Sequence, residues 1–357
     1  LLSLASKDYF AAPAGEGNFL AIQVSSARSS RKGQRMDFHQ WGGITRPVEL
    51  EALPEFYVDD AWVRGRFDEK RADVHVVTRG TRPKSARLRV TVRPTAGGKA
   101  MAAERELSPF GDETVVSVPL DDFRPWSPEH PNLYWADVEL VADGQVTMTR
   151  RERFGVKKFE VRGKELYLND RPFFLRGFGD DSQYPLTGVS PADRAYHLAH
   201  LKTARAAGFN GVRLHTHCEV PEYFEAADEA GIMIQPELSY YMDDPDDAFG
   251  YDPVRDALER WVAFRRHPSY AINSSGNEGL LGPGAGRIVY SLLKKTDPDR
   301  LVIEEDMGSA EAENNGLDLE GRTDYVGGPL NTWPRGSFDP DRPFVCHEYM
   351  NLCVKQD

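Results

Sequence analysis

The feature that most constrains the fold is a change of hydrophobic period near Lys164. Before it, short segments alternate between apolar and polar residues, as in antiparallel strands buried on one face. After it, short apolar runs alternate with segments of helical period, which favours parallel pairing of the strands. The runs expected as strands are Arg171–Gly177, Gly211–His217, Ile232–Glu237, the run from Ser269 towards Glu278, Leu301–Glu305, Asp324–Val326 and Pro343–Tyr349. Seven such units predict a (β/α)8 TIM barrel that lacks its last strand within this chain.

Residue types mark the expected helix ends between these strands. Ser190 and Pro191 suit the N-cap and first position of one helix, which Gly208 ends. A second helix is expected at Pro221–Ala230 with Gly231 as its stop. The remaining expected helices are Pro253–Arg266 and Arg287–Lys295.

The chain divides into three expected domains. Residues 1–52 hold short strand-like pieces but too little sequence for a core of their own, so we expect the end of a larger β domain. Residues 53–160 predict an immunoglobulin-like β-sandwich, with Trp126 and Tyr134 in its core. Residues 161–357 form the incomplete barrel.

Composition excludes several classes of partner. The net charge is −12, from 44 Lys and Arg against 56 Asp and Glu, with no long basic cluster, so we expect neither nucleic acid nor an anionic membrane as a partner. No apolar run is long enough for a membrane span. The three cysteines have neither a disulfide-framework nor a zinc-site spacing. The compartment and the N-terminal signal are not indicated, and a homo-oligomer is left open.

Two acidic residues end apolar runs of the expected barrel. Glu278 follows Ser275-Gly-Asn, and Glu348 lies 70 residues further on, before Tyr349. Active sites of these barrels lie at the C-terminal ends of the strands, and paired carboxylates there can cleave a glycosidic bond. The alternatives are a solvated loop acid for Glu278 and a salt-bridge acid for Glu348.

Several segments together resemble glycoside hydrolase family 2, which includes β-galactosidases, β-glucuronidases and β-mannosidases. These segments are Trp41–Leu50, Arg124–Tyr134, Phe154–Phe159, Leu168–Gly177 and Ser275–Glu278. The resemblance implies a partial sugar-binding jelly roll in residues 1–52, an immunoglobulin-like domain and the TIM barrel. It also implies a retaining exo-β-glycosidase of β-galactosidase or β-glucuronidase type, acting on the end of an oligosaccharide or polysaccharide. A catalytically inactive carbohydrate-binding homologue is the alternative.

The resemblance also implies roles for particular residues. Glu278 would be the acid/base, with Asn277 reaching the sugar 2-hydroxyl. Glu348 would be the nucleophile, with Tyr349 beside it in the substrate site. Arg213 would keep the nucleophile ionised, although a structural ion pair is the alternative for this residue.

Other candidate substrate-binding residues follow the first, second and sixth expected strands. Asp180 and Asp181 occupy positions where the family binds outer hydroxyls of the terminal sugar, and a turn role is the alternative for them. His215 and His217, two apart on an expected strand, would face the same side and form a wall of the sugar pocket; a glutamate two residues further on makes a metal site conceivable. Trp333 would stack under the sugar or simply pack.

One departure from the family pattern bears on cofactors. Metal-using β-galactosidases have Glu and then His two residues later after the third strand, whereas Ser239 follows Glu237 here. We therefore expect no metal and no organic cofactor.

Overall fold

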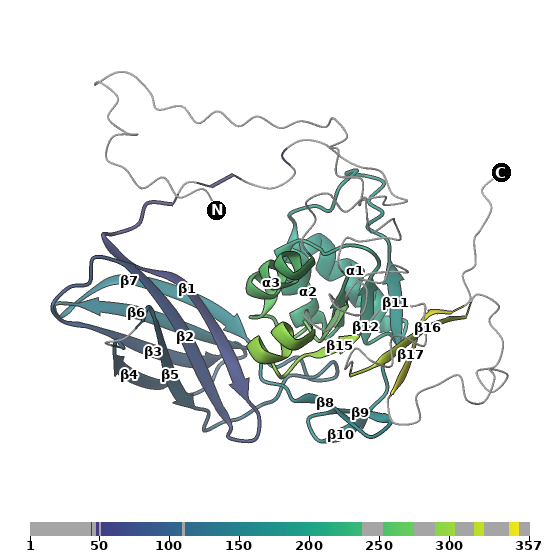
Figure 1. The fold of residues 1–357 in the computed structure, drawn as a ribbon, viewed down its shortest axis with the longest axis horizontal. Coiled ribbons are helices and arrows are strands. Elements are labelled where there is room, and N and C mark those ends of the chain that lie inside the picture. Colours follow the sequence, from purple (N-terminus) through teal and green to yellow (C-terminus); the bar gives the residue numbers. More distant parts are fainter. Residues whose placement is uncertain are drawn as a thin grey trace, which may run out of the picture.

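A computed structural model describes residues 44, 48–49, 51–108, 111–237, 253–274, 290–303, 318–324 and 343–349. The expected jelly-roll segment, residues 1–52, lies outside the described residues except at five positions. The described part consists of a β-sandwich and a region of parallel strands and helices beside it, as Figure 1 shows. Among the described residues, no helix is both long and apolar enough to cross a membrane.

The sandwich consists of two antiparallel sheets whose strands alternate buried and exposed residues. The first sheet has the order β1–β2–β5 and the second the order β4–β3–β6–β7. Their bounds are β1 Phe56–Arg66, β2 Arg71–Gly80, β3 Ala86–Pro94, β4 Met101–Glu106, β5 Glu113–Pro119, β6 Tyr134–Ala142 and β7 Gln145–Phe154. The inward-facing residues form one hydrophobic core, which includes Val74, Leu88, Val138 and Phe154. This arrangement confirms the immunoglobulin-like sandwich expected from the alternating pattern.

Tyr134 and Trp126, both expected in the sandwich core, have different surroundings. Tyr134 is fully buried in that core, and its hydroxyl accepts a hydrogen bond from the Arg124 backbone N–H at 2.7 Å. Trp126 is also fully buried but belongs to a second core, with Met233 and Ile272 of the parallel strands. Its indole Nε1 donates to the carbonyl oxygen of Asp228 at 2.8 Å. The prediction for Trp126 was wrong in detail, because the loop before β6 turns this ring towards the neighbouring domain.

In chain order, a small antiparallel sheet comes between the sandwich and the parallel strands. It consists of β8 (Phe159–Arg162), β9 (Glu165–Leu168) and β10 (Arg171–Phe173) in the order β10–β9–β8. The expectation that Arg171–Gly177 is the first barrel strand was wrong. Asn169 and Asp170 both have positive φ, at 53° and 64°, and close a two-residue hairpin that turns β10 back onto β9.

Seven parallel strands follow in chain order. They are β11 Gly177–Asp180, β12 Gly211–Leu214, β13 Met233–Pro236, β14 Ile272–Ser274, β15 Leu301–Ile303, β16 Glu320–Asp324 and β17 Phe344–Tyr349. Ladders join β11 to β12, β12 to β13, β14 to β15 and β16 to β17. Isolated parallel bridges connect β13 to β14 and Ile303 to Leu319, just before β16. The series is that of a TIM barrel, and within the described ranges it does not close into a full circle.

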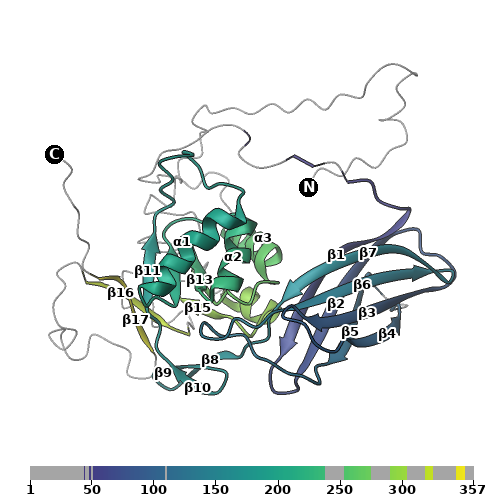
Figure 2. The same cartoon turned by 180° about the vertical axis from the view of Figure 1, so that it is seen from behind.

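Helices cover the outside of these strands, as Figure 2 shows from behind. They are α1 (Arg194–Ala206), α2 (Pro221–Ala230), α3 (Pro253–Phe264) and a helical segment at 290–296. The bounds of α2 were predicted correctly, and Gly231 ends this helix in the left-handed conformation. The N-cap predicted at Ser190 was wrong. Asp193 caps α1 instead, through a 2.8 Å hydrogen bond to the Ala195 N–H.

Charged and aromatic side chains join the sandwich to the barrel region. Arg64 of β1 forms a two-point hydrogen bond with Asp299, at 2.6 and 2.7 Å. Lys157, which follows β7, donates to the carbonyl oxygen of Tyr270 at 2.9 Å. Burial lowers the pKa of Lys157 well below its ordinary value. These contacts fix the sandwich against the side of the barrel rather than over the C-terminal ends of its strands.

Candidate active site

The candidate site lies where the parallel strands end. Parallel strands present their C-terminal ends at one face, so residues that follow different strands become neighbours there. Asp180 ends β11, Arg213 lies one residue before the end of β12, and Glu237 follows β13 directly. Backbone hydrogen bonds extend the ladders past the strand ends, from His215 N–H to Asp180 O at 3.0 Å and from Glu237 N–H to His217 O at 3.2 Å.

A buried ion pair joins the ends of the second and third parallel strands. Arg213 Nε lies 2.5 Å from Glu237 Oε1, and Arg213 Nη2 lies 3.3 Å from Glu237 Oε2. The Thr216 N–H donates to Glu237 Oε2 at 2.8 Å. Glu237 is fully buried and the Arg213 side chain is 8% exposed, so the two charges stabilise one another away from water. The structural ion pair considered for Arg213 is therefore present.

This pairing also bears on a cation at Glu237, as in metal-using members of the family. The charged Arg213 guanidinium donates hydrogen bonds to both carboxylate oxygens of Glu237. The Arg213 guanidinium neutralises the carboxylate, and a divalent cation would meet an uncompensated positive charge beside it. The residues at this position do not fit a metal.

Asp181 and His215 form a second pair at the same face. His215 Nδ1 lies 2.8 Å from Asp181 Oδ1, and this hydrogen bond holds the pKa of Asp181 below its ordinary value. The Asp181 side chain is 52% exposed. The pair therefore combines a carboxylate and an imidazole at the surface of the expected sugar pocket.

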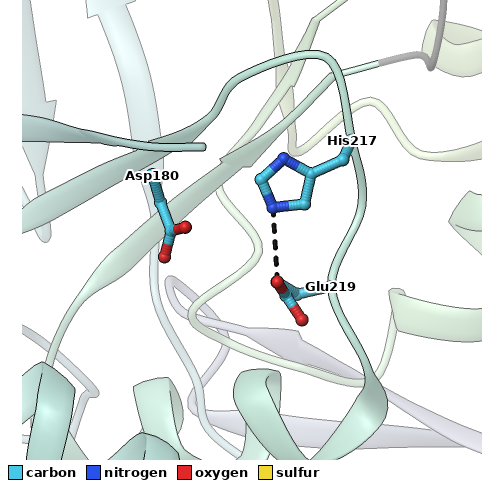
Figure 3. A group of neighbouring side chains, drawn as sticks. All are labelled: Asp180, His217 and Glu219. Atoms are coloured by element: carbon cyan, nitrogen blue, oxygen red, sulfur yellow. Dashed lines mark ion pairs between the residues drawn. The ribbon is translucent and has the colours of Figure 1, made fainter. Parts of the chain in front are cut away.

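The expectation that His215 and His217 face the same side of a strand was wrong. Strand β12 ends at Leu214, and Thr216 has a φ of 56°, which reverses the chain between the two histidines. His215 consequently contacts Asp181, whereas His217 lies with Asp180 and Glu219, as Figure 3 shows.

Asp180, His217 and Glu219 form a cluster, called here the acidic triad. One ligand-type atom from each residue lies within 4.8 Å of the others. His217 Nε2 lies 3.3 Å from Glu219 Oε1, and both residues are buried. Tyr184 donates to Glu219 Oε1 at 2.7 Å, Ser190 donates to Glu219 Oε2, and Tyr223 donates to Asp180 Oδ2 at 3.0 Å. The described residues contain one such group that could hold a metal ion.

The triad shifts the protonation of its members. Burial opposes ionisation of Glu219, but hydrogen bonds and charge from His217, Ser190 and Tyr184 outweigh it and lower the pKa of Glu219 to about 2. Burial opposes the charge on His217 as well, but Glu219 outweighs it and raises the pKa of His217. Burial and the neighbouring Glu219 charge raise the pKa of Tyr184. Glu219 therefore remains ionised across the neutral range.

The sequence predicted only part of the acidic triad and its hydrogen-bond partners. Glu219 entered only as a conceivable metal ligand beside two histidines, Ser190 was taken as a helix cap, and Tyr184 was missed. The His-x-Glu spacing at 217–219 is the local signal for part of the group. The contribution of Asp180 depends on the pairing of β11 with β12, which no local pattern records.

A cavity of about 610 Å³ lies among the first residues of the parallel strands and beside the small antiparallel sheet, from which Leu166 and Phe173 line it. Its wall is largely apolar, with contributions from both the first and the seventh strand of the series, including Phe178 and Val345. Arg213 and Gln235 line it as polar residues. The cavity thus extends from the small sheet to Arg213 of the candidate site.

Several predicted site residues fall outside what the structure describes. Glu278, Asn277 and Trp333 lie outside the described residues. Glu348 and Tyr349 are described through their backbone alone, as the last residues of β17, where they pair with Thr323 and Asp324 of β16. The roles predicted for these five residues stay predictions.

Comparisons with known proteins agree with this architecture. Residues 56–157 match the family described as Glycosyl hydrolases family 2, and residues 159–356 match Glycosyl hydrolases family 2, TIM barrel domain. The chain belongs to glycosyl hydrolase family 2. This finding bears out the resemblance carried by the sequence motifs.

Individual relatives are distant in sequence. A β-galactosidase of Halalkalibacterium halodurans is 24% identical over 360 residues, covering 94% of this chain and 34% of its own length. A β-galactosidase large subunit of Latilactobacillus sakei is also 24% identical over 360 residues, covering 94% of this chain and 55% of its own length. The chain thus spans between a third and just over half of these curated relatives.

Solved structures share the fold. A crystal structure of Bacteroides uniformis β-glucuronidase superposes with a TM-score of 0.73 at 20% identity, covering 91% of this chain and 45% of that chain. The apo structure of Bacteroides uniformis β-glucuronidase 3 gives a TM-score of 0.70 at 18% identity, covering 85% and 40%. These similarities establish a common arrangement of sandwich and barrel.

Proposed function

We propose that the protein is a retaining exo-β-glycosidase that removes a terminal sugar from an oligosaccharide or polysaccharide. The observation that carries the proposal is the position of Glu348 in β17, the seventh parallel strand of a family 2 barrel. The Gly-Asn-Glu278 motif begins two residues after β14, the fourth strand of the same series. Both acids therefore follow or end strands whose C-terminal ends meet at one face.

In this mechanism the two glutamates act in turn on the same glycosidic bond. Glu278 donates a proton to the departing oxygen while Glu348 attacks the anomeric carbon and forms a glycosyl-enzyme. Glu278, now ionised, then removes a proton from a water molecule that releases the sugar with its original anomeric configuration. Glu278 must hold its proton near neutral pH, and Glu348 must be charged.

The described residues supply the surroundings that such a reaction needs. Arg213 lines the cavity and is paired with Glu237, and we assign it the additional role of favouring the ionised form of the nucleophile. Asp181 and His215 offer an acceptor and an imidazole to sugar hydroxyls. We assign Asp180, Asn277, His217, Trp333 and Tyr349 to the same pocket as further substrate-binding candidates.

The names of the relatives indicate which sugars to test first. The curated relatives are named β-galactosidases and the solved structures β-glucuronidases. A panel of aryl β-galactoside, β-glucuronide and β-mannoside substrates should therefore reveal one clear preference. Proton NMR of the first-formed product reports the anomeric configuration, and we expect retention.

One variant, with a matched control, tests the role of Glu348 directly. Glu348→Gln should abolish hydrolysis and prevent formation of a glycosyl-enzyme detectable by mass spectrometry with a fluorinated substrate. Glu104→Gln, on the exposed surface of β4, is the matched control and should keep full activity. If the wild-type protein binds the sugar but hydrolyses none of the panel, the carbohydrate-binding homologue replaces the enzyme as the best reading.

A further inference from the structure

We propose that the acidic triad, Asp180, His217 and Glu219, binds a divalent transition-metal cation such as Zn²⁺. The triad lies between two loops: Asp180 ends β11, and the other two residues follow β12. An imidazole nitrogen with two carboxylates is a donor set that suits Zn²⁺ or Mn²⁺. The site is separate from Glu237, whose carboxylate is already neutralised by Arg213.

The tautomer of His217 is the first argument. Its Nδ1 lies 2.8 Å from the carbonyl oxygen of His215. A carbonyl oxygen can only accept, so Nδ1 must carry the proton. In the neutral ring, Nε2 therefore presents a lone pair to Glu219, and Figure 3 joins these two groups by a dashed line with Asp180 beside them. A lone pair facing a carboxylate oxygen is repulsive, and either a proton on Nε2 or a metal cation between the two groups removes that repulsion.

The geometry at Nε2 is the second argument. His217 is only 6% exposed, and within the described part of the chain its Nε2 has an ion-pair contact with Glu219 that lacks the geometry of a hydrogen bond. The 3.3 Å between Nε2 and Glu219 Oε1 exceeds the usual length of a charge-assisted hydrogen bond, about 2.7–2.9 Å. Two ligands about 2.1 Å from a tetrahedral metal lie about 3.4 Å apart. The separation therefore matches a pair of metal ligands better than a direct hydrogen bond.

Supporting hydrogen bonds orient all three side chains. Metal-bound histidines commonly donate their other N–H to a backbone carbonyl, and ligating carboxylates are commonly hydrogen-bonded in turn. His217 follows the first pattern through His215 O. Tyr184 and Ser190 donate to Glu219, while Ser182 N–H and Tyr223 donate to Asp180 at 2.9 and 3.0 Å. The side chains are thus held in place before any cation arrives.

Charge balance is the third argument. With His217 neutral, the triad carries two negative charges, which one divalent cation neutralises. The His200 ring lies 3.8 Å from Asp180 Oδ2 but is 49% exposed, so solvent screens its contribution. A bound cation would cross-link the loops after β11 and β12 beside the sugar pocket.

The competing account is a doubly protonated His217 in an ion pair with Glu219. Both accounts neutralise the buried Glu219 carboxylate, but only the metal site predicts that the purified protein retains a cation. The test is equilibrium dialysis of the purified protein against Zn²⁺ after treatment with a chelator, followed by elemental analysis. We expect one tightly bound equivalent that also raises the thermal unfolding midpoint.

Three variants make the result specific. His217→Gln should lose the bound equivalent and the thermal shift. Tyr184→Phe removes the hydrogen bond to Glu219 Oε1 but leaves all three ligand side chains in place, and it should weaken Zn²⁺ binding about 10–100-fold. His215→Gln, two residues from His217 but paired with Asp181, is the matched control and should bind Zn²⁺ as the wild type does.

The outcomes that overturn the proposal are equally specific. Wild-type protein that retains no Zn²⁺ leaves the ion pair as the correct account. Equal retention by wild type and a folded His217→Gln variant places the metal elsewhere. If His217→Gln fails to fold, unchanged affinity in Tyr184→Phe overturns the proposal instead. Because metal binding is measured without substrate, none of these outcomes depends on the proposed glycosidase activity.

Discussion

The Nε atom of Arg213 lies 2.5 Å from Oε1 of Glu237, and this buried pair joins the ends of two neighbouring strands, β12 and β13. Removing one partner of a buried ion pair leaves an uncompensated charge, which typically costs about 3–5 kcal/mol. Glu237→Gln keeps the size of the side chain but removes its charge. We expect this change to lower the free energy of unfolding by about 3–5 kcal/mol in urea titrations.

An exposed pair provides the control for this measurement. Arg255 and Glu259 lie four residues apart in α3, with side chains 74% and 64% exposed. Solvent screens such a pair, so Glu259→Gln should cost less than about 1 kcal/mol. Similar costs for the two glutamine variants would mean that the Arg213–Glu237 pair contributes no special stability.

The proposed acid role of Glu278 predicts a dependence on the leaving group. A phenyl β-glycoside needs a proton on its departing oxygen, whereas a dinitrophenyl β-glycoside leaves as a stable anion. General acid catalysis contributes about 10²–10⁴-fold, so Glu278→Gln should lose kcat/KM by that factor on the phenyl substrate and far less on the dinitrophenyl substrate. Steady-state kinetics on both substrates measures this ratio. An equal loss on the two substrates would exclude Glu278 as the acid.

Ionisation of Glu219 predicts a loss of stability in acid. Its folded pKa of about 2 lies below the ordinary value of 4.5, so its contribution is present above pH 4.5 and declines as the pH falls towards 2. The shift corresponds to a contribution on the order of 3 kcal/mol. Denaturant titrations between pH 2 and pH 6, with a chelator present, should show a steeper decline for wild type than for Glu219→Gln.

The pH dependence of stability expected from His217 has the opposite sign, and the same experiment measures it. Its folded pKa is raised above 6.5, so its contribution is present below pH 6.5 and declines as the pH rises through the folded pKa. His217→Gln should therefore flatten the stability profile on the alkaline side. If the wild-type and variant profiles run parallel across neutral pH, the ring does not gain its proton in the folded state, and the charged form of the pair is excluded.

The sequence predicted best the features that depend on neighbouring residues. Pro221 at the first position of α2 and Gly231 after its last residue gave both helix ends correctly, because each residue type acts on its own backbone. The error at Arg171–Gly177 has a local origin that was overlooked. Asn169 and Asp170 both tolerate positive φ, and their hairpin takes residues 171–173 out of the barrel.

The parts of the site that escaped prediction depend on contacts between distant segments. Ser190 has the right chemistry for a helix cap, but its hydroxyl donates to Glu219, 29 residues away. The pairing of Arg213 with Glu237 follows from the register of β12 against β13, which the sequence alone does not specify. Most of the parallel strands could thus be predicted, whereas the partners of individual polar residues could not.

Alanine substitutions at two glycines that follow helices test how closely the sandwich packs against the barrel. Gly208, after α1, has a φ of 96°, and a Cβ there would meet no atom within 4 Å. Gly231, after α2, has a φ of 72°, but a Cβ there would lie 2.3 Å from the Pro128 carbonyl oxygen in the loop before β6. Gly208→Ala should therefore lower the free energy of unfolding by about 1–2 kcal/mol, which is the cost of the left-handed conformation alone. Gly231→Ala should cost about 1–3 kcal/mol more, because Pro128 must move. If the two variants lose the same free energy of unfolding, in thermal or urea titrations, the loop at Pro128 moves away from the new Cβ at no cost.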